Sequence, residues 1–412
     1  MKTRGTSQSL SAGLLIAGIL LVAANLRPVL TSVGPLLDQI GADTGLGTTA
    51  LGVLAAVPLL AFGAVSPLAH GLSEKFGVER TVFGALMLLV AGTFLRPVPG
   101  AIANLWIGTF LVGAAIAVCN VMLPALLKRD FPERMASLTG AYSAVLGGCA
   151  SLGAGLAVPL ALLPVGGGPA GWRFALAAFV VLAVPAVLLW LPRLRRGKAA
   201  EERARAAAAP ALVRGSVWKS GLAWHVTVYM GLQSMTFYIL ITWLPTLERF
   251  HGRGDLASGW DLMLFQLIGV VSSLLTPIAL RGPTQLLAAS LPPLLVVAGG
   301  VGMMLMPQVM LFWVLVAGFG CGSSLVTALS LFGLRTRTHR EAGALSGMAQ
   351  SIGYLLAAAG PPIFGGLFAA TGAWETSLAL LCLIAVAQAA IGLLVGRDRF
   401  AFRPVSPTAP AG

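Results

Sequence analysis

An arginine lies inside an apolar segment that is long enough to cross a membrane as a helix. It is Arg27, in the run Asn25-Leu26-Arg27-Pro28, and no Asp or Glu is near it in the sequence. A cation costs ~3 kcal/mol or more in hydrocarbon, so an ionisable residue in such a segment usually faces a cavity and has a function. Arg27 is therefore a candidate binding group for a small anionic or strongly polar solute. The alternative is that Arg27 bonds helix carbonyls and only holds the bundle together.

Prolines next to Arg27 predict that this helix is broken. Pro28 cannot donate to the carbonyl oxygen one turn earlier, and the pair Gly34-Pro35 interrupts the helix again. In transporters, a broken helix beside a polar side chain exposes backbone and guanidinium donors to the solute. Asn25 is a further binding candidate, but it lies about 200° around the helix from Arg27. We therefore expect Asn25 to brace the bundle or to orient a neighbouring residue.

A second polar and aromatic segment occurs in the second half of the chain. Gln233 and Phe237 are four residues apart and share one helix face, as do Ser234 and Tyr238. An amide group with aromatic walls suits a small planar polar solute. Trp243, near the outer end of the same segment, is typical either of an interfacial aromatic belt or of a gate.

Other apolar segments also contain amide and phenol side chains. Asn120 lies in one of them, and Gln350 and Tyr354 share a helix face in another because they are four residues apart. Each of these three residues either contacts the solute or joins helices by hydrogen bonds, which are worth ~0.6 kcal/mol on average in membranes. Tyr142 is a further binding candidate.

The sequence contains no signature of catalysis. We find no phosphate-binding loop, no metal-ligand cluster and no pairing of a nucleophile with a base, so we expect neither enzymatic activity, nor a cofactor, nor coupling to ATP. The four cysteines have scattered spacings that fit neither a metal motif nor a disulfide framework. They lie within apolar segments, at Cys119, Cys149, Cys321 and Cys382.

The elements that position these residues are predicted to be membrane-spanning helices. Of the 412 residues, 57% are hydrophobic and 10% are charged, whereas about a quarter of the residues of a soluble domain are charged. Apolar segments of about 18 to 25 residues, the length that spans a bilayer as a helix, recur along the chain. Their lengths do not suit a β-barrel, whose strands are about ten residues long. We predict an all-α membrane protein with twelve spans, at 12–37, 48–71, 80–97, 101–127, 135–162, 171–191, 217–247, 257–280, 284–306, 309–333, 342–370 and 374–396.

The net charge of +13 does not indicate nucleic acid as a partner, because the basic residues lie in alternate loops. If both termini are cytoplasmic, 22 of the 27 Lys and Arg residues lie on that side. Positive loops stay in the cytoplasm, so we predict a multi-pass protein of the cell (inner) membrane with both termini inside. On the outside we expect only Arg96, Arg173, Arg249 and Arg253.

An internal repeat divides the chain into two halves. A shift of 206 residues aligns Arg129 with Arg335 and Arg134 with Arg340, together with several small residues. We therefore predict an N-terminal six-helix half at 1–191, a cytoplasmic linker at 192–216, and a C-terminal half with a short basic tail at 217–412. Transporters of this kind bind their solute near the midplane, between the halves. The same shift aligns Arg27 with Gln233, so the two residues are expected to face each other.

The loop between the second and third spans contains an acid and several bases at helix ends. Glu74, Lys75, Gly77 and Arg80 are candidate gating residues, which would lock the inner end of the bundle through a salt bridge. Ordinary solvation of a loop is the alternative. This loop resembles the motif G-x-L-A-D-R-x-G-R-R of the major facilitator superfamily. His70, Val78 and Glu79 depart from that motif.

A closer resemblance covers most of the chain. The matching runs are Asn25-Leu26-Arg27-Pro28 with Gly34-Pro35-Leu36, Asn120-Val121, Gln233-Ser234 with Phe237-Tyr238 and Trp243-Leu244-Pro245, and Gln350-Ser351 with Gly353-Tyr354 and Gly360-Pro361. In combination they resemble the family of cyanate and 2-nitroimidazole transporters. The resemblance implies a permease for a small planar solute, which is an anion in the case of cyanate. Members of the family differ in solute and in direction.

Together, these observations predict a secondary active or facilitative transporter that moves a small planar anionic or polar solute by alternating access. Its partners would be the solute and the lipid bilayer, and we expect it to function as a monomer. The alternative is a proton-coupled exporter of drug-like compounds. Proton relays need carboxylates or histidines inside the membrane, whereas all 14 acids, including Glu248, Asp261 and Glu375, map to loops or helix ends. A membrane enzyme would show clustered acids, His or Cys at one face, and a sensor would show a soluble domain; neither pattern occurs.

Overall fold

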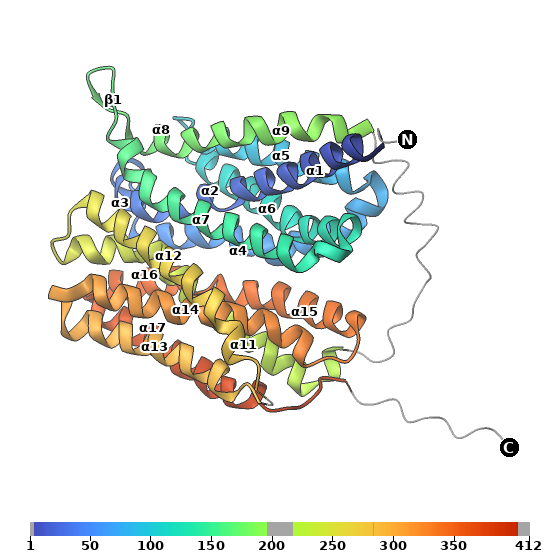
Figure 1. Ribbon diagram of the computed structural model, residues 1–412. Helices are drawn as coiled ribbons and strands as arrows, with labels where there is room; N and C mark the ends of the chain where they lie inside the picture. Colours follow the sequence, from blue (N-terminus) through green and yellow to red (C-terminus); the bar gives the residue numbers. More distant parts are fainter. Residues whose placement is uncertain (1–3, 196–216, 283, 403–412) are drawn as a thin grey trace.

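The computed structural model describes residues 4–195, 217–282 and 284–402 (Figure 1). Most of the predicted linker, from residue 196 to residue 216, and the C-terminal tail from residue 403 lie outside the described residues. Within the described part the chain is almost entirely helical, as predicted. One two-stranded antiparallel hairpin, β1 (Pro164–Val165) with β2 (Gly168–Pro169), lies at one end of the molecule. We call this end the hairpin end.

The first half of the chain begins at the end opposite the hairpin end and consists of the following elements in order. They are α1 (Arg4–Leu26), α2 (Pro28–Thr31), α3 (Val33–Thr44), α4 (Thr48–Phe76), α5 (Val78–Leu95), α6 (Ala103–Asp130), η1 (Pro132–Arg134), α7 (Met135–Ala161), the hairpin, α8 (Gly171–Ala178), η2 (Phe179–Leu182), α9 (Ala183–Trp190) and η3 (Leu191–Arg195). This half appears in blue to green in Figure 1.

The second half of the chain lies beside the first and is drawn in yellow to red in Figure 1. Its elements are η4 (Val217–Lys219), α11 (Gly221–Phe250), α12 (Asp255–Ala279), α13 (Leu286–Leu305), η5 (Pro307–Val309), α14 (Met310–Leu334), α15 (His339–Ala357), α16 (Gly360–Thr371) and α17 (Trp374–Val395). Between the halves, α3 contacts α11 and α12, α4 contacts α15 and α16, and α7 contacts α12.

Twelve helical segments of the described residues are long enough to cross a bilayer. Eleven of them are also apolar enough by mean hydropathy. The remaining one is α11, whose 30 residues extend about 45 Å at 1.5 Å per residue. Its buried polar side chains, among them Gln233, Ser234 and Thr236, lower its hydropathy. The predicted fold class, a twelve-helix membrane protein, is confirmed.

The internal repeat has a direct counterpart in the structure. In the first half, Arg129 donates from Nη2 to Oε1 of Glu79 at 2.6 Å. In the second half, Arg335 donates from Nη2 to Oε1 of Gln285. Both residues of the second pair lie 206 positions after those of the first. The halves therefore share an equivalent side-chain hydrogen bond as well as a helix order.

Three predicted helices are divided, and the breaks differ from expectation. The first helix ends at Leu26 and restarts at Pro28 and again at Val33, so its second break precedes Gly34-Pro35. Pro35 lies in the first turn of α3, where a missing N–H removes no helical bond. The predicted span 342–370 is likewise divided before Pro361, and the span 171–191 contains the 3₁₀ segment η2.

Candidate solute-binding site

Arg27 lies in the turn between α1 and α2, half-buried at the centre of the molecule. Its Nη1 donates to the phenol oxygen of Tyr238 at 3.3 Å. Tyr238 lies on α11, so this hydrogen bond joins the two halves of the chain. The backbone carbonyl of Arg27 accepts bonds from the amides of Leu30 and Thr31 at 3.0 Å. The backbone carbonyl at the helix break therefore has hydrogen-bond donors within the same segment. The guanidinium is not needed to bond it and points to the second half of the chain.

The charge of Arg27 is not neutralised by a carboxylate in the described part of the chain. The ion pairs described there involve Arg129, Arg173, Arg249 and Arg253 instead. Three phenol groups interact electrostatically with Arg27, those of Tyr238, Tyr354 and Tyr142. Neutral phenol rings do not cancel the charge of a guanidinium, so its charge and its N–H donors remain available to bind an anion.

Aromatic rings from four helices form the walls around this position. Phe237 lies 5.4 Å from Tyr238 and stacks at 6.2 Å on Phe265 of α12, measured between ring centroids. On the other side, Tyr354 of α15 packs edge-to-face on Phe62 of α4 at 5.3 Å. Flat walls of this kind complement a planar solute. The structure thus brings Arg27, Phe237, Tyr238, Tyr142 and Tyr354 together.

Gln233 does not contact Arg27. It is buried on α11, where its side-chain oxygen accepts from Ser234 at 3.2 Å. The residue that meets Arg27 across the halves is Tyr238, five positions farther along the helix. The shift of 206 residues aligns positions in the sequence, whereas the partner of Arg27 depends on how the first helix packs against α11.

The remaining amide candidates lie at the edge of this group. Gln350 is half-buried on α15 and donates from Nε2 to Ser346 Oγ on the same helix at 2.8 Å. Asn120 is half-buried on α6 and forms no hydrogen bond among the described contacts. Contact with a solute therefore stays a prediction for both.

Two predicted binding residues have structural partners. Asn25 donates from Nδ2 to the carbonyls of Leu21 at 2.7 Å and Leu182 at 2.8 Å, and so braces α1 against η2. Trp243 is 1% exposed, and its Nε1 donates to the carbonyl of Pro361 at 2.8 Å. This burial excludes the interfacial-belt interpretation of Trp243, which instead ties α11 to the start of α16.

The predicted gating residues lie where α4 ends and α5 begins. Glu74, Lys75 and Arg80 are exposed, and Gly77 between them has φ 89°, a conformation that favours glycine. Sequence reasoning missed the buried bond beside them, in which Glu79 pairs with Arg129 of α6 at 2.6 Å. Burial disfavours the charged form of Arg129, but hydrogen bonds to Asp130 and Glu79 outweigh it and raise its pKa.

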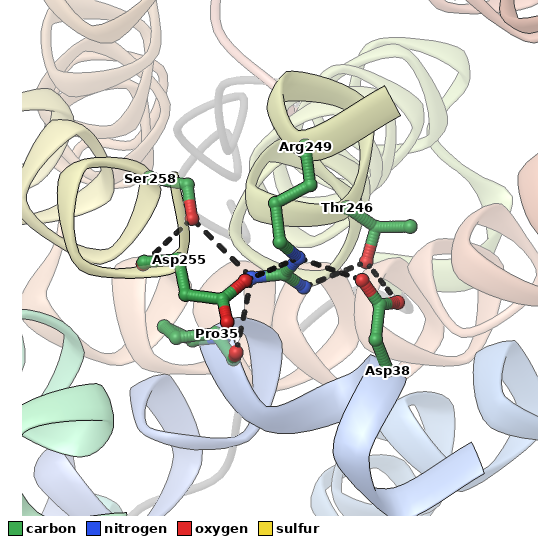
Figure 2. A network of polar contacts seen from close by, with 6 residues as sticks. All are labelled: Pro35, Asp38, Thr246, Arg249, Asp255 and Ser258. Atoms are coloured by element: carbon green, nitrogen blue, oxygen red, sulfur yellow. Dashed lines mark hydrogen bonds and ion pairs between the residues drawn. The ribbon is translucent and has the colours of Figure 1, made fainter. Parts of the chain in front are cut away.

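A network of polar contacts joins the halves at the hairpin end (Figure 2). Arg249 of α11 pairs through Nε with Asp38 of α3 at 2.7 Å, and its Nη1 donates to the carbonyl of Pro35 at 3.2 Å. Thr246 also donates to Asp38, at 2.9 Å. Further contacts run from Arg249 to Ser258 and Asp255 of α12. The sequence indicated Arg249 only as an outer cation.

Two helical halves that span a membrane, with a cation and aromatic walls between them, are typical of a membrane transporter. The chain belongs to the Major Facilitator Superfamily, because the sequence model of that family matches residues 15–361. It is 40% identical to the 2-nitroimidazole transporter of Escherichia coli (strain K12) over 386 residues, which cover 93% of this chain and 96% of the relative.

Other known proteins are similar in sequence or in fold. The cyanate transport protein CynX of Escherichia coli (strain K12) is 28% identical over 384 residues, covering 93% of this chain and 96% of that protein. The crystal structure of a D-xylose-proton symporter has a TM-score of 0.74 at 14% identity, covering 94% of this chain and 98% of that chain. A bacterial homolog of the human lysosomal transporter Spinster reaches 0.75 at 12% identity, covering 94% and 97%. The predicted family resemblance is confirmed.

Proposed function

We propose that this protein moves a small planar anionic or polar solute, such as cyanate or a nitroimidazole, across the membrane by alternating access. The observation that carries the proposal is Arg27, a half-buried guanidinium between the halves that has a phenol, and no carboxylate, as its partner in the described part of the chain. A cation in such a position attracts an anion, and its planar fork of donors suits a flat one.

The aromatic walls support the planar shape of the solute. Phe237, Tyr238 and Tyr354 present rings close to Arg27, so a flat solute would stack on one ring while it bonds the guanidinium. The names of two relatives, a 2-nitroimidazole transporter and a cyanate transport protein, fit a solute of this size.

The Arg249–Asp38 pair supports alternating access. It bridges the halves at the hairpin end, so a solute at Arg27 would reach that side only after the pair separates. Most basic loop residues belong to the opposite end, which is expected to be cytoplasmic. We therefore propose that the described conformation is closed to the outside.

One observation favours the alternative, a proton-coupled exporter. Glu248 of α11 is 0% exposed, and neither carboxylate oxygen has a hydrogen-bond partner among the described residues. The charged groups that act on it are Asp261, Arg253 and Arg249. An ionised carboxylate without a direct partner is costly in such a place, so its packing suits a bound proton. Glu248 lies at a helix end as predicted, but it is not solvated there.

The test is uptake of labelled cyanate and 2-nitroimidazole by purified protein in liposomes. Arg27→Gln is expected to abolish transport, whereas Arg27→Lys keeps the charge and retains part of it. Arg281→Gln, which changes an exposed arginine, serves as the control and should transport normally. Near-normal transport by folded Arg27→Gln would show that Arg27 does not bind the solute, and the proposal would then be wrong.

A further inference from the structure

A second arginine is buried near the hairpin end. Arg96 follows α5 and is 1% exposed, although the sequence predicted it on the outside, at the end of the span 80–97. Its Nη2 donates to the carbonyl of Val29 in α2 at 3.0 Å. The other two nitrogens, Nε and Nη1, have no hydrogen-bond partner among the described residues.

Arg96 lines a small cavity between the halves. The cavity has a volume of about 30 Å³, and the polar groups on its wall include Thr109 of α6, Thr242 of α11 and the phenol of Tyr238. A single water needs ~10–15 Å³. The cavity therefore has room for an ion of one to about three heavy atoms, and a nitroimidazole ring is too large for it.

The surroundings of Arg96 lack the group that normally accompanies a buried cation. No acidic side chain of the described residues pairs with it. A buried charge with unsatisfied donors is destabilising unless a partner of opposite charge binds. An anion in the cavity would supply that charge.

We infer that the cavity at Arg96 is a binding site for a small linear or monoatomic anion, of which cyanate and the halides are the chemical type. This inference deepens the proposed function and rests on it for one point, that the bound anion is the transported solute.

The site is connected to Arg27 through shared neighbours. Tyr238 accepts from Arg27 and also lines the cavity of Arg96. Val29, whose carbonyl holds Arg96, lies two residues after Arg27. Arg96 is on the side of the Arg249 network, because Gly34 of α3 lines the same cavity. An anion leaving Arg27 toward the hairpin end would meet Arg96 next.

Arg96 could instead have only a structural role, as a donor to the Val29 carbonyl. In that case its replacement would not change the affinity of the folded protein for anions. We would titrate purified full-length protein with potassium cyanate and with potassium bromide, measuring affinity by calorimetry. Arg96→Gln is expected to weaken binding at this site by about tenfold or more, the effect of losing charged hydrogen bonds, and Arg96→Lys to recover part of it. Arg281→Gln is the matched control. Unchanged affinity in folded Arg96→Gln overturns the inference.

A second measurement covers the case in which the Arg96 variants fail to fold. Crystals of the wild-type protein soaked in bromide should give an anomalous peak in the cavity that Arg96 lines, and no peak there overturns the inference. Arg27→Gln separates the two proposals, since it should abolish transport while the bromide peak at Arg96 persists. Transport that survives in Arg27→Gln overturns the proposed function and leaves the peak at Arg96 unaffected.

Discussion

Arg27 is the residue on which transport is expected to depend, and Tyr238 is the residue that holds it in place. The single bond between them, at 3.3 Å, crosses from the first half of the chain to the second. A side chain bonded in this way can respond both to a solute and to the relative position of the halves. Substitutions at the residues that contact Arg27 can therefore distinguish a role in solute binding from a role in holding the halves together.

Tyr238→Phe removes that bond and keeps the ring. Hydrogen bonds to charged groups contribute ~1.5–3 kcal/mol, so we expect the half-saturation concentration for cyanate to rise about tenfold in liposome uptake. Tyr229→Phe is the control, since it also removes a buried phenol hydrogen bond, to the carbonyl of Ala289, but belongs to a separate cluster of buried residues. An unchanged half-saturation concentration in Tyr238→Phe would mean that Tyr238 does not orient Arg27.

Gln233 gives a separate prediction because it is buried and bonded to Ser234. If Gln233 contacts the solute when the halves rearrange, Gln233→Ala raises the half-saturation concentration. The melting temperature of the purified variant shows whether any loss comes from unfolding instead. An unchanged half-saturation concentration removes Gln233 from the binding site.

Glu248 is predicted to be neutral in the described conformation, because both carboxylate oxygens are buried without partners among the described residues. Glu248→Gln replaces a neutral acid by an amide of the same shape, so its melting temperature should stay close to that of the wild type. Any dependence of uptake on a pH gradient should be lost. Glu375→Gln, which changes an exposed acid at the start of α17, is the control. A large loss of stability in Glu248→Gln would show that the carboxylate is charged and paired.

Among the elements, the broken first helix comes close to the second half at Gly34. Gly34, in the first turn of α3, lies directly against the carbonyl of Ile241 on α11, and an added Cβ would overlap that oxygen. The break between α2 and α3 therefore brings backbone against backbone near the hairpin end. A side chain at this position would prevent that approach.

Gly34→Ala is expected to lower the stability of the purified protein by ~1–3 kcal/mol, the usual effect of overpacking. Gly84→Ala is the matched control, because nothing lies within 4 Å of its added Cβ, and alanine favours a helix more than glycine does. Denaturation followed by circular dichroism compares the two variants. Equal stability would show that α3 moves away from α11 at little cost.

At the scale of the whole molecule, the described conformation has its polar bridge at the hairpin end. Asp38, Thr246 and Arg249 connect α3 with α11 there (Figure 2). Asp38 is 46% exposed in its side chain, so the pair is worth at most ~1 kcal/mol. A contribution of this size can hold one state and still allow the halves to separate.

Asp38→Asn is expected to shift the molecules a few-fold toward a state open at the hairpin end, consistent with a change of ~1 kcal/mol. Spin labels at Ala42→Cys and Leu256→Cys, both exposed at that end, would report the distance between the halves. Asp43→Asn is the matched control, because Asp43 pairs with Arg173 inside the first half. Identical distance distributions for the Asp38 and Asp43 variants would exclude the bridge as a gate.

Local properties of the chain determined the number of spans, the division into halves and the helix break at Arg27. Hydropathy depends on successive residues, and a proline removes a bond within its own turn. The repeat even indicated the correspondence between Arg129 and Arg335, which form equivalent bonds in the two halves. The positions of Arg27, Phe237, Tyr238 and Tyr354 in one site followed from the same patterns.

The partners of these residues depended on how the helices pack. Arg27 bonds Tyr238 rather than Gln233, Arg96 bonds Val29 beside a cavity instead of facing water, and Arg249 reaches Asp38 across the halves. Each pair joins helices far apart in the chain. Such contacts depend on the rotation and tilt of each helix, which hydropathy does not report because a span has the same composition at every rotation.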